Sequence, residues 1–330
     1  MILFRTYSFS CLLLALLVFF PAKQVLALQN VQSEALIFID EMVEKHGFDK
    51  QVLKQLFSQT KVNETVLKAI RSPSEAKPWH QYRKIFLTDS RVRKGVDYWK
   101  KNESTLLLAT NQYGVPPEII VAIIGVETQY GGYTGSFKVL DSLYTLAFEY
   151  PKRSRFFRTQ LEHFLLLCRE EALDPTIPEG SYAGAMGLPQ FMPSSYRSYA
   201  QDFDKDNVRD IWHNNADTIA SVANYFSKHG WQTNNPIAYP VTVSGKLYES
   251  ALEKGLKPNR TIQQLRALDI RIPQLVDPQE KARLIAFEEL NGPNFWVGLE
   301  NFYVITRYNH SAHYAMAVLQ LSKKILARQR

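Results

Sequence analysis

Glu127 is the residue whose surroundings most clearly suggest acid–base chemistry. It follows residues 119–126 (IIVAIIGV), which are apolar apart from one glycine, and it precedes Gly131 and Gly132. A segment that is apolar all round is expected to be a buried helix, which the two glycines would end. Desolvation and the negative end of the helix dipole both favour a protonated carboxyl, as a general acid requires. From the spacing alone, an alternative remains: Glu127 is an exposed glutamate at a fraying helix end and pairs with an arginine.

A second candidate segment, residues 181–196 (SYAGAMGLPQFMPSSY), combines small residues with polar and apolar side chains. Gly184 and Gly187 allow the backbone to approach a ligand closely. Ser181 and Gln190 offer hydrogen bonds, and the phenylalanine and methionines of this segment offer apolar surface to sugar rings. Taken alone, the same composition is equally typical of tight helix packing.

Residues 202–212 (DFDKDNVRDIW) place carboxylates with the oxygen-ligand spacing of an EF-hand. The acids at loop positions 1, 3, 5 and 9 are Asp202, Asp204, Asp206 and Asp210. Val208 stands at position 7, where a backbone carbonyl is the usual ligand, and Asn207 replaces the usual glycine of position 6. His213 stands where a bidentate glutamate is expected. The segment predicts a structural Ca²⁺ or Na⁺ that takes no part in chemistry, with a solvated acidic loop as the alternative.

The first 27 residues have the pattern of a secretory signal peptide. Arg5 supplies a positive charge, residues 11–20 (CLLLALLVFF) form a short apolar run, and cleavage is expected after Ala27. The run is too short for a permanent transmembrane helix. A lipid anchor at Cys11 is disfavoured because this cysteine precedes most of the apolar run. The sequence therefore predicts an exported protein.

Composition and charge exclude several other classes of function. The 330-residue chain has a formal charge of +7 that is spread along its length, which disfavours nucleic acid as a partner and suits an anionic polymer. Removal of the signal peptide would leave one cysteine, Cys168, in an apolar helical segment. This thiol is expected to be a small buried hydrophobe, and no zinc-like cluster of cysteine and histidine is present in the sequence.

The elements that must position these residues are mainly helical. We expect an N-terminal helical domain over residues 28–115 and a catalytic core over residues 116–235. Short strand-like runs with one helix, TIQQLRAL, predict a small α+β domain over residues 236–297. Residues 298–330 end in a helix that is expected to pack back on the core. The fold class is therefore mainly α, with a small inserted α+β domain.

Four separated motifs carry a resemblance to a known family: VETQYGG, GAMGLPQFMPSSY, SVANYFSKHGW and NFYVITRYN. Together and in this order they resemble the lytic transglycosylase B family of murein-cleaving enzymes, from about residue 35 to residue 325. The resemblance implies a goose-lysozyme-like helical core with an attached α domain and a small β domain.

The resemblance also implies roles for individual residues. Glu127 matches the single catalytic acid of the family, and Asp217 matches the last metal ligand of a slightly longer loop, although a helix cap is an alternative for Asp217. The expected substrate-binding residues are Tyr82, Ser181, Met186, Gln190, Tyr225, Tyr308, Asn309, Lys152 and Arg153. Lys152 departs from an arginine pair in the family, which weakens bidentate recognition of a peptide stem there.

The implied reaction uses one carboxyl group where most glycosidases use two. Glu127 would protonate the bond between N-acetylmuramic acid and N-acetylglucosamine, and would then deprotonate the carbon 6 hydroxyl to leave a 1,6-anhydro end. Ser181 and Asn309 would orient the carboxyl and the substrate N-acetyl group. The rival second carboxylate, Asp141, is expected to be a helix N-cap.

Two other functions remain open from the sequence: a lysozyme-type hydrolase on the same fold, and a non-catalytic glycan-binding scaffold. The resemblance implies glycan strands of peptidoglycan as the partner, no cofactor in catalysis, a monomer, and a periplasmic location. Cell-wall synthesis enzymes are candidate protein partners.

Overall fold

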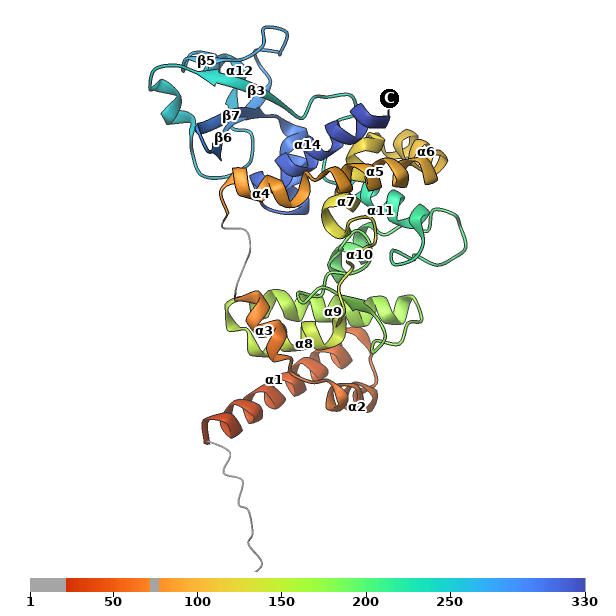
Figure 1. Cartoon of the computed structure of the whole chain (residues 1–330). Helices are drawn as coiled ribbons and strands as arrows, with labels where there is room; N and C mark the ends of the chain where they lie inside the picture. Colours follow the sequence, from red (N-terminus) through yellow and green to blue (C-terminus); the bar gives the residue numbers. More distant parts are fainter. Residues whose placement is uncertain (1–21, 72–76, 330) are drawn as a thin grey trace, which may run out of the picture. The chain divides into compact units, whose positions relative to one another are not determined.

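The computed structural model describes residues 22–71 and 77–329, and of residues 22–32 only the backbone (Figure 1). Most of the expected signal peptide lies outside the described residues, whereas the expected cleavage position after Ala27 falls within the backbone of α1. The chain divides into two compact units, one ending at Gln59 and the other beginning at Thr60. The domain boundaries expected at 115/116, 235/236 and 297/298 remain predictions.

The described part of the first unit, residues 22–59, contains the helices α1 (Ala22–His46) and α2 (Lys50–Gln59). The rings of Phe38 and Phe57 stack with centroids 6.1 Å apart and join the two helices. Helix α1 ends directly before a glycine, and Gly47 takes a left-handed conformation (φ 65°). Asp49 then caps α2, because its carboxylate accepts hydrogen bonds from the N–H groups of Gln51 and Val52.

The central helix of the second unit is α7 (Pro117–Thr128), the helix that carries Glu127. All residues from Ile119 to Val126 are buried, so the prediction of a buried helix is confirmed. Each of these large aliphatic side chains contributes about 1.5–3 kcal/mol to stability by burial. The helices packed around α7 are α5 (Asp89–Lys101), α6 (Glu103–Tyr113), α11 (Asn215–Lys228) and α14 (Ala312–Gln329).

The end of α7 differs from the expected glycine stop. Gln129, not a glycine, is the left-handed C-cap (φ 51°), and Tyr130 is also left-handed (φ 63°). The N–H groups of these two residues bond to the carbonyls of Gly125 and Ile124. A cap made by a non-glycine residue costs about 1 kcal/mol or more and is retained where surrounding contacts fix it.

Two antiparallel helices, α8 (Val139–Glu149) and α9 (Ser154–Glu170), run side by side in the second unit (Figure 1). A short 3-10 turn, η2 (Pro151–Arg153), joins them. Strand β1 (Phe137–Lys138) precedes this helical hairpin in the sequence and strand β2 (Glu179–Gly180) follows it, and the two strands pair with each other. Cys168 is buried on α9, which confirms the prediction of a small buried hydrophobe, and desolvation raises the pKa of its thiol.

The predicted N-cap role of Asp141 is wrong. Lys138 is the N-cap of α8, and Asp141 lies inside the first turn of the helix. Burial raises the pKa of the Asp141 carboxyl, while a hydrogen bond from the backbone N–H of Lys61 lowers it. The carboxylate therefore holds the segment before α3 (Glu64–Ile70) against α8 and does not cap the N-terminus of its own helix.

Two further short helices of the second unit are α4 (Trp79–Phe86) and α10 (Pro193–Tyr199). A five-stranded antiparallel sheet has the order β4-β6-β7-β3-β5. Its strands are β3 (Ala238–Val243), β4 (Arg260–Thr261), β5 (Ile270–Arg271), β6 (Lys281–Glu289) and β7 (Gly292–Gly298). The sheet thus occupies the region predicted to be a small α+β domain, and the predicted helix is present as α12 (Ile262–Arg266). The chain returns to the helical core through α13 (Glu300–Tyr308) and α14.

Candidate active site

Glu127 lies in the last turn of α7, after a fully buried run of apolar residues. The residue as a whole keeps some exposed surface, but its carboxyl is desolvated. Burial raises the pKa of Glu127 to about 7, and one hydrogen bond from a tyrosine lowers it. A carboxyl with a pKa near neutrality can both give and take a proton at physiological pH.

The tyrosine that bonds to Glu127 is Tyr314, near the start of α14. Its hydroxyl donates to Oε1 of Glu127 across 2.5 Å, and the side chain is buried. Sequence reasoning assigned no role to this residue. The available signal was its place in NHSAHY, directly after the RYN motif.

An aromatic cluster lies beside Glu127 and includes two of the predicted substrate-binding residues, Tyr225 and Tyr308. Their rings are 4.7 Å apart, and Phe191 lies 5.7 Å from Tyr225 and 5.9 Å from Tyr308. Tyr308 also stacks on Tyr314 at 6.4 Å, and its pKa is raised first by burial and then by the charge of Glu127. The structure therefore brings Tyr308 to the candidate acid.

The hydroxyls of these tyrosines are held by backbone carbonyls. Tyr308 donates to the carbonyl of Pro189 at 2.6 Å, and Tyr225 donates to the carbonyl of Arg307 at 2.7 Å. Because their protons are engaged, the two hydroxyls can only accept a hydrogen bond from a ligand without rearranging. Asn309 follows Tyr308 and is half-buried at the end of α13.

Tyr82 on α4 is buried among other aromatic rings. Its ring lies 5.4 Å from His313 and 6.2 Å from Trp79. His313 directly precedes Tyr314 in the chain, so Tyr82 lies near the same cluster. Three of the predicted residues, from two separated motifs and α4, thus belong to the aromatic cluster beside the Glu127 carboxyl: Tyr82, Tyr225 and Tyr308.

The glycine-rich segment folds into a tight loop against the end of α7. The hydroxyl of Thr128 donates to the carbonyl of Leu188 at 3.1 Å. Gln190 has a left-handed backbone (φ 51°), and its Nε2 donates to the carbonyls of Thr134 and Gly187. The side-chain oxygen of Gln190 is the part of the amide that these bonds leave for a ligand.

Ser181 closes the other end of this loop. Its hydroxyl oxygen accepts hydrogen bonds from the N–H groups of Ala183 and Ala185, at 3.3 and 3.0 Å. Within residues 22–71 and 77–329 no hydrogen bond joins Ser181 to Glu127, so orientation of the carboxyl by Ser181 remains a prediction.

The predicted contact of Met186 with substrate needs correction. Its side chain has no exposed surface, and its backbone pairs with Phe191 in both directions. Met186 therefore supports the loop from within the core and does not present a surface to a ligand. An apolar side chain suits both contact with a sugar and packing in the core, so the residue type alone could not distinguish these two roles.

The expected basic pair, Lys152 and Arg153, lies in the η2 turn and is exposed. The Arg153 guanidinium lies 4.3 Å from the ring centroid of Phe156. The interactions that the structure gives for the described residues do not join this pair to the Glu127 cluster, so binding of a peptide stem there stays a prediction.

The acidic loop brings three of the predicted metal ligands together. Oxygens of Asp202, Asp204 and Asp217 all lie within 4.8 Å of one another. Asp202 also accepts hydrogen bonds from the N–H groups of Asp206 and Asn207, and Asn207 takes the left-handed conformation expected at position 6 (φ 71°). Three converging carboxylates fit a hard cation with oxygen ligands.

The predicted alternative role of Asp217 as a helix cap is wrong. Asn214 caps α11, with its side chain accepting from the N–H groups of Ala216 and Asp217. The Asp217 carboxylate instead accepts from the N–H groups of Phe203 and Asp210 and so ties both ends of the loop together. Burial raises its pKa to about 6, those hydrogen bonds lower it, and the neighbouring carboxylates raise it.

The other two predicted ligands stand apart from the three-carboxylate group. Asp206 accepts a hydrogen bond from the N–H of Val208 at 2.8 Å. The Val208 side chain is half exposed, and coordination by its carbonyl remains a prediction.

Comparison with known proteins places the chain in a family. Residues 31–323 match the model described as a transglycosylase SLT domain, so the chain belongs to this family. It is 45% identical over 298 residues to the membrane-bound lytic murein transglycosylase B of Escherichia coli K12, covering 87% of this chain and 81% of the relative.

Two solved structures support the fold. The soluble lytic transglycosylase SltB1 of Pseudomonas aeruginosa matches with a TM-score of 0.86 and 47% identity, covering 90% of this chain and 100% of the other. The Escherichia coli lytic transglycosylase Slt35, solved in complex with calcium, matches with a TM-score of 0.83 and 44% identity, covering 90% and 93%. The predicted family and the predicted lysozyme-like, mainly helical fold are confirmed.

The Tyr314→Phe variant tests the hydrogen bond to Glu127. Because this bond lowers the pKa of the carboxyl, its loss is expected to raise that pKa. The carboxyl then stays protonated to higher pH, and the descending limb of the kcat/KM profile shifts to higher pH. The measurement is the pH profile of glycan cleavage for both proteins. An unchanged descending limb would contradict this account.

Proposed function

We propose that this protein is a lytic transglycosylase of peptidoglycan in which Glu127 acts first as general acid and then as general base. The activity is that of the family to which the chain belongs. The observation that carries the catalytic assignment is the desolvated Glu127 carboxyl, with a pKa of about 7 and a bond from Tyr314.

The proposed reaction begins with proton transfer from Glu127 to the glycosidic oxygen, which leaves with the N-acetylglucosamine side. The substrate's own N-acetyl group shares the positive charge at the muramic acid anomeric carbon. Glu127 then takes the proton of the carbon 6 hydroxyl, whose oxygen closes on the anomeric carbon. No water is consumed, and the Glu127 carboxyl returns to its protonated form.

A single carboxyl is favoured because the rival acid is engaged elsewhere. The Asp141 carboxylate accepts from the backbone of Lys61 and interacts with the charge of Lys138. The aromatic rings beside Glu127 suit stacking against sugar faces, and the Gln190 oxygen suits a hydroxyl or amide donor.

Mass spectrometry of fragments released from purified sacculi tests the proposal. A 1,6-anhydromuramic acid end, lighter than the reducing end by one water, is the expected product. Reducing ends would instead identify a lysozyme-type hydrolase. Binding of sacculi without any release would identify a non-catalytic glycan-binding protein.

We also propose a structural calcium ion held by Asp202, Asp204 and Asp217, which would neutralise the mutual repulsion of these carboxylates and hold the loop. The calcium complex of Slt35 supports this assignment. The metal supplies no step of the reaction.

Calcium at 100 times its Kd is expected to stabilise the protein by about 2.7 kcal/mol, or roughly 5–10 °C in Tm. Calorimetry with calcium and with a chelator measures this difference. Asp204→Asn should abolish the response, whereas exposed Asp97→Asn should retain it. Equal melting temperatures with and without calcium in the unmodified protein would refute the site.

Export is proposed from the N-terminal 27 residues, with cleavage after Ala27 and a periplasmic location. The relatives are soluble or membrane-bound murein enzymes. None of the helices in the described part of the chain is long and apolar enough to span a membrane. N-terminal sequencing of the protein isolated from its cells tests the cleavage position.

A further inference from the structure

The chain directly after Glu127 and Thr128 contains three successive residues in the left-handed conformation. They are Gln129 (φ 51°), Tyr130 (φ 63°) and Gly131 (φ 89°). This conformation is unfavourable for residues that carry a Cβ, as the first two do. Strained backbone of this kind persists only where surrounding contacts fix it, and it gathers at functional sites. Tertiary contacts must therefore hold this turn, which begins two residues beyond the candidate acid.

The side chain of Tyr130 lies between two helices, α7 and α5. A Cβ on Gly125 of α7 would lie 2.4 Å from the Tyr130 hydroxyl oxygen and 2.9 Å from its ring Cε1. A Cβ on Gly95 of α5 would lie 2.5 Å from the same oxygen. The ring also lies 5.6 Å from that of Tyr98 on α5. The phenol thus occupies a glycine slot, formed by Gly95 and Gly125, that would be too narrow if either residue carried a side chain.

The glycine slot is kept against several local preferences. Glycine inside a helix is less favourable than alanine, and the slot needs one glycine in each of two helices. The Tyr130 hydroxyl is buried and has no hydrogen-bond partner among residues 22–71 and 77–329. Desolvation raises the pKa of Tyr130, so the phenol is neutral. A contact retained against such preferences points to a role other than stability.

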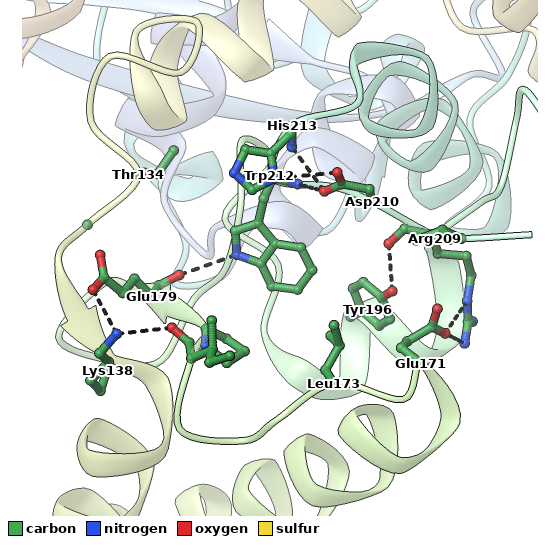
Figure 2. A pocket seen from close by; sticks show the side chains of 14 residues that line it. Thr134, Lys138, Glu171, Leu173, Glu179, Tyr196, Arg209, Asp210, Trp212 and His213 are labelled. Carbon is green, nitrogen blue, oxygen red and sulfur yellow. Dashed lines mark hydrogen bonds and ion pairs between the residues drawn. The ribbon is translucent and has the colours of Figure 1, made fainter. Parts of the chain in front are cut away.

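The far end of the same turn is held by the glycine-rich segment. The N–H of Gly131 donates to the hydroxyl of Thr128 at 3.1 Å. Gln190 then donates to the carbonyl of Thr134 at 3.0 Å, where the chain reaches the lining of a cavity of about 540 Å³ (Figure 2). The turn is therefore anchored at one end by the Tyr130 ring and at the other by the Gln190 amide.

We propose that Tyr130 is a positioning residue for the reaction at Glu127. Its ring, held in the glycine slot, fixes the left-handed end of α7 and with it the direction and the burial of the Glu127 carboxyl. The inference rests on the proposed function, because it takes Glu127 as the acid. Tyr130 acts through the backbone of α7 and takes no part in proton transfer.

The groups that interact with Glu127 and with Tyr130 lie on different helices. In the described part of the chain, Tyr314 on α14 donates to the Glu127 carboxyl, and Tyr308 on α13 interacts with its charge. Arg91 and Tyr98, both on α5, interact with Tyr130. A displaced end of α7 would therefore move the carboxyl relative to Tyr314 and expose it to water.

Such a displacement has a definite sign in the pH profile. Burial is the larger influence on the pKa of Glu127 and raises it, whereas the weaker hydrogen bond from Tyr314 lowers it. Exposure to water is therefore expected to lower this pKa, so that the carboxyl loses its proton at lower pH. The descending limb of the kcat/KM profile would then shift to lower pH.

Three substitutions test the role of the ring, with kcat, KM and the pH profile measured on soluble glycan strands. Tyr130→Ala is expected to lower kcat by about 10- to 100-fold, with little change in KM, and to shift the descending limb to lower pH. Tyr130→Phe keeps the ring and removes an unpaired buried hydroxyl, so it should retain kcat, the profile and the melting temperature. Tyr248→Ala is the matched control, because Tyr248 is also half-buried and packs on one ring, Phe295, at 5.0 Å. It should lose stability but keep kcat and the limb.

Gly125→Ala tests the slot itself and decides the matter if Tyr130→Ala does not fold. Without the ring, alanine would favour the interior of α7. With the ring present, the added Cβ displaces Tyr130, so kcat should fall and the limb should shift as in Tyr130→Ala. In the Tyr130→Ala background, Gly125→Ala should cause no further loss.

Several results would overturn the positioning role while leaving Glu127 as the acid. They are unchanged kcat in folded Tyr130→Ala or Gly125→Ala, a fall in kcat with an unmoved descending limb, a loss in Tyr130→Phe, and an equal loss in Tyr248→Ala. Full activity of Glu127→Gln would instead remove the proposed function and this inference with it.

Discussion

Replacement of Glu127 by glutamine is expected to lower glycan cleavage by about 1000-fold or more, because general acid–base catalysis commonly contributes 10²–10⁴-fold and one group here serves both steps. Glutamine keeps the shape of the side chain and can still accept the hydrogen bond from Tyr314. The measurement is release of soluble fragments from sacculi at neutral pH, together with sacculus binding.

Glu149→Gln is the matched control for this substitution. Glu149 also lies at the C-terminal end of a helix, α8, and burial also raises its pKa. The Glu149→Gln variant should retain normal activity, because a raised pKa alone, without the aromatic cluster, does not make a glutamate catalytic. Comparable activity of Glu127→Gln and the unmodified protein would remove the assigned catalyst.

Replacement of Gly187 by alanine is expected to lower the free energy of unfolding by about 2–4 kcal/mol. Gly187 has a left-handed backbone (φ 65°), and a Cβ there would lie 2.5 Å from the carbonyl oxygen of Ile211. That oxygen accepts the hydrogen bond from Leu188 that joins the glycine-rich loop to the acidic loop. The substitution therefore disturbs the contact between the glycine-rich loop and the acidic loop.

Gly230→Ala separates this clash from backbone strain. Gly230 is also left-handed (φ 90°), but an added Cβ would meet nothing within 4 Å. The Gly230→Ala variant should lose about 1 kcal/mol in free energy of unfolding, the usual difference between alanine and glycine in this conformation. Calorimetry of both variants gives the comparison, and equal losses would show that the close approach to Ile211 does not matter.

Local pattern predicted the parts of the molecule that depend on neighbours in sequence. The apolar run before Glu127 identified a buried helix, and the EF-hand spacing placed Asn207 at the position of the usual glycine, where its backbone is left-handed. In both cases the physical cause, hydrophobic burial or backbone tolerance, acts over a few residues.

Contacts across long sequence separations were not predictable in the same way. Tyr314 meets Glu127 across 187 positions, and only the packing of α14 on α7 brings the two together. The resemblance assigned Met186 to substrate binding, and an apolar side chain fits both a sugar and a core, so the residue type could not show that Met186 is buried. Asp141 and Asp217 resembled caps, but tertiary hydrogen bonds to Lys61, and to Phe203 and Asp210, use their carboxylates.

The protonation of Glu127 at neutral pH is tested most directly by ¹³C NMR titration of glutamate carboxyl carbons, with Glu127 assigned by its loss in Glu127→Gln. The structure predicts a midpoint of about 7. A midpoint near the ordinary value of 4.5 would contradict it, because the group would then have no proton to donate at the pH at which the enzyme is proposed to work.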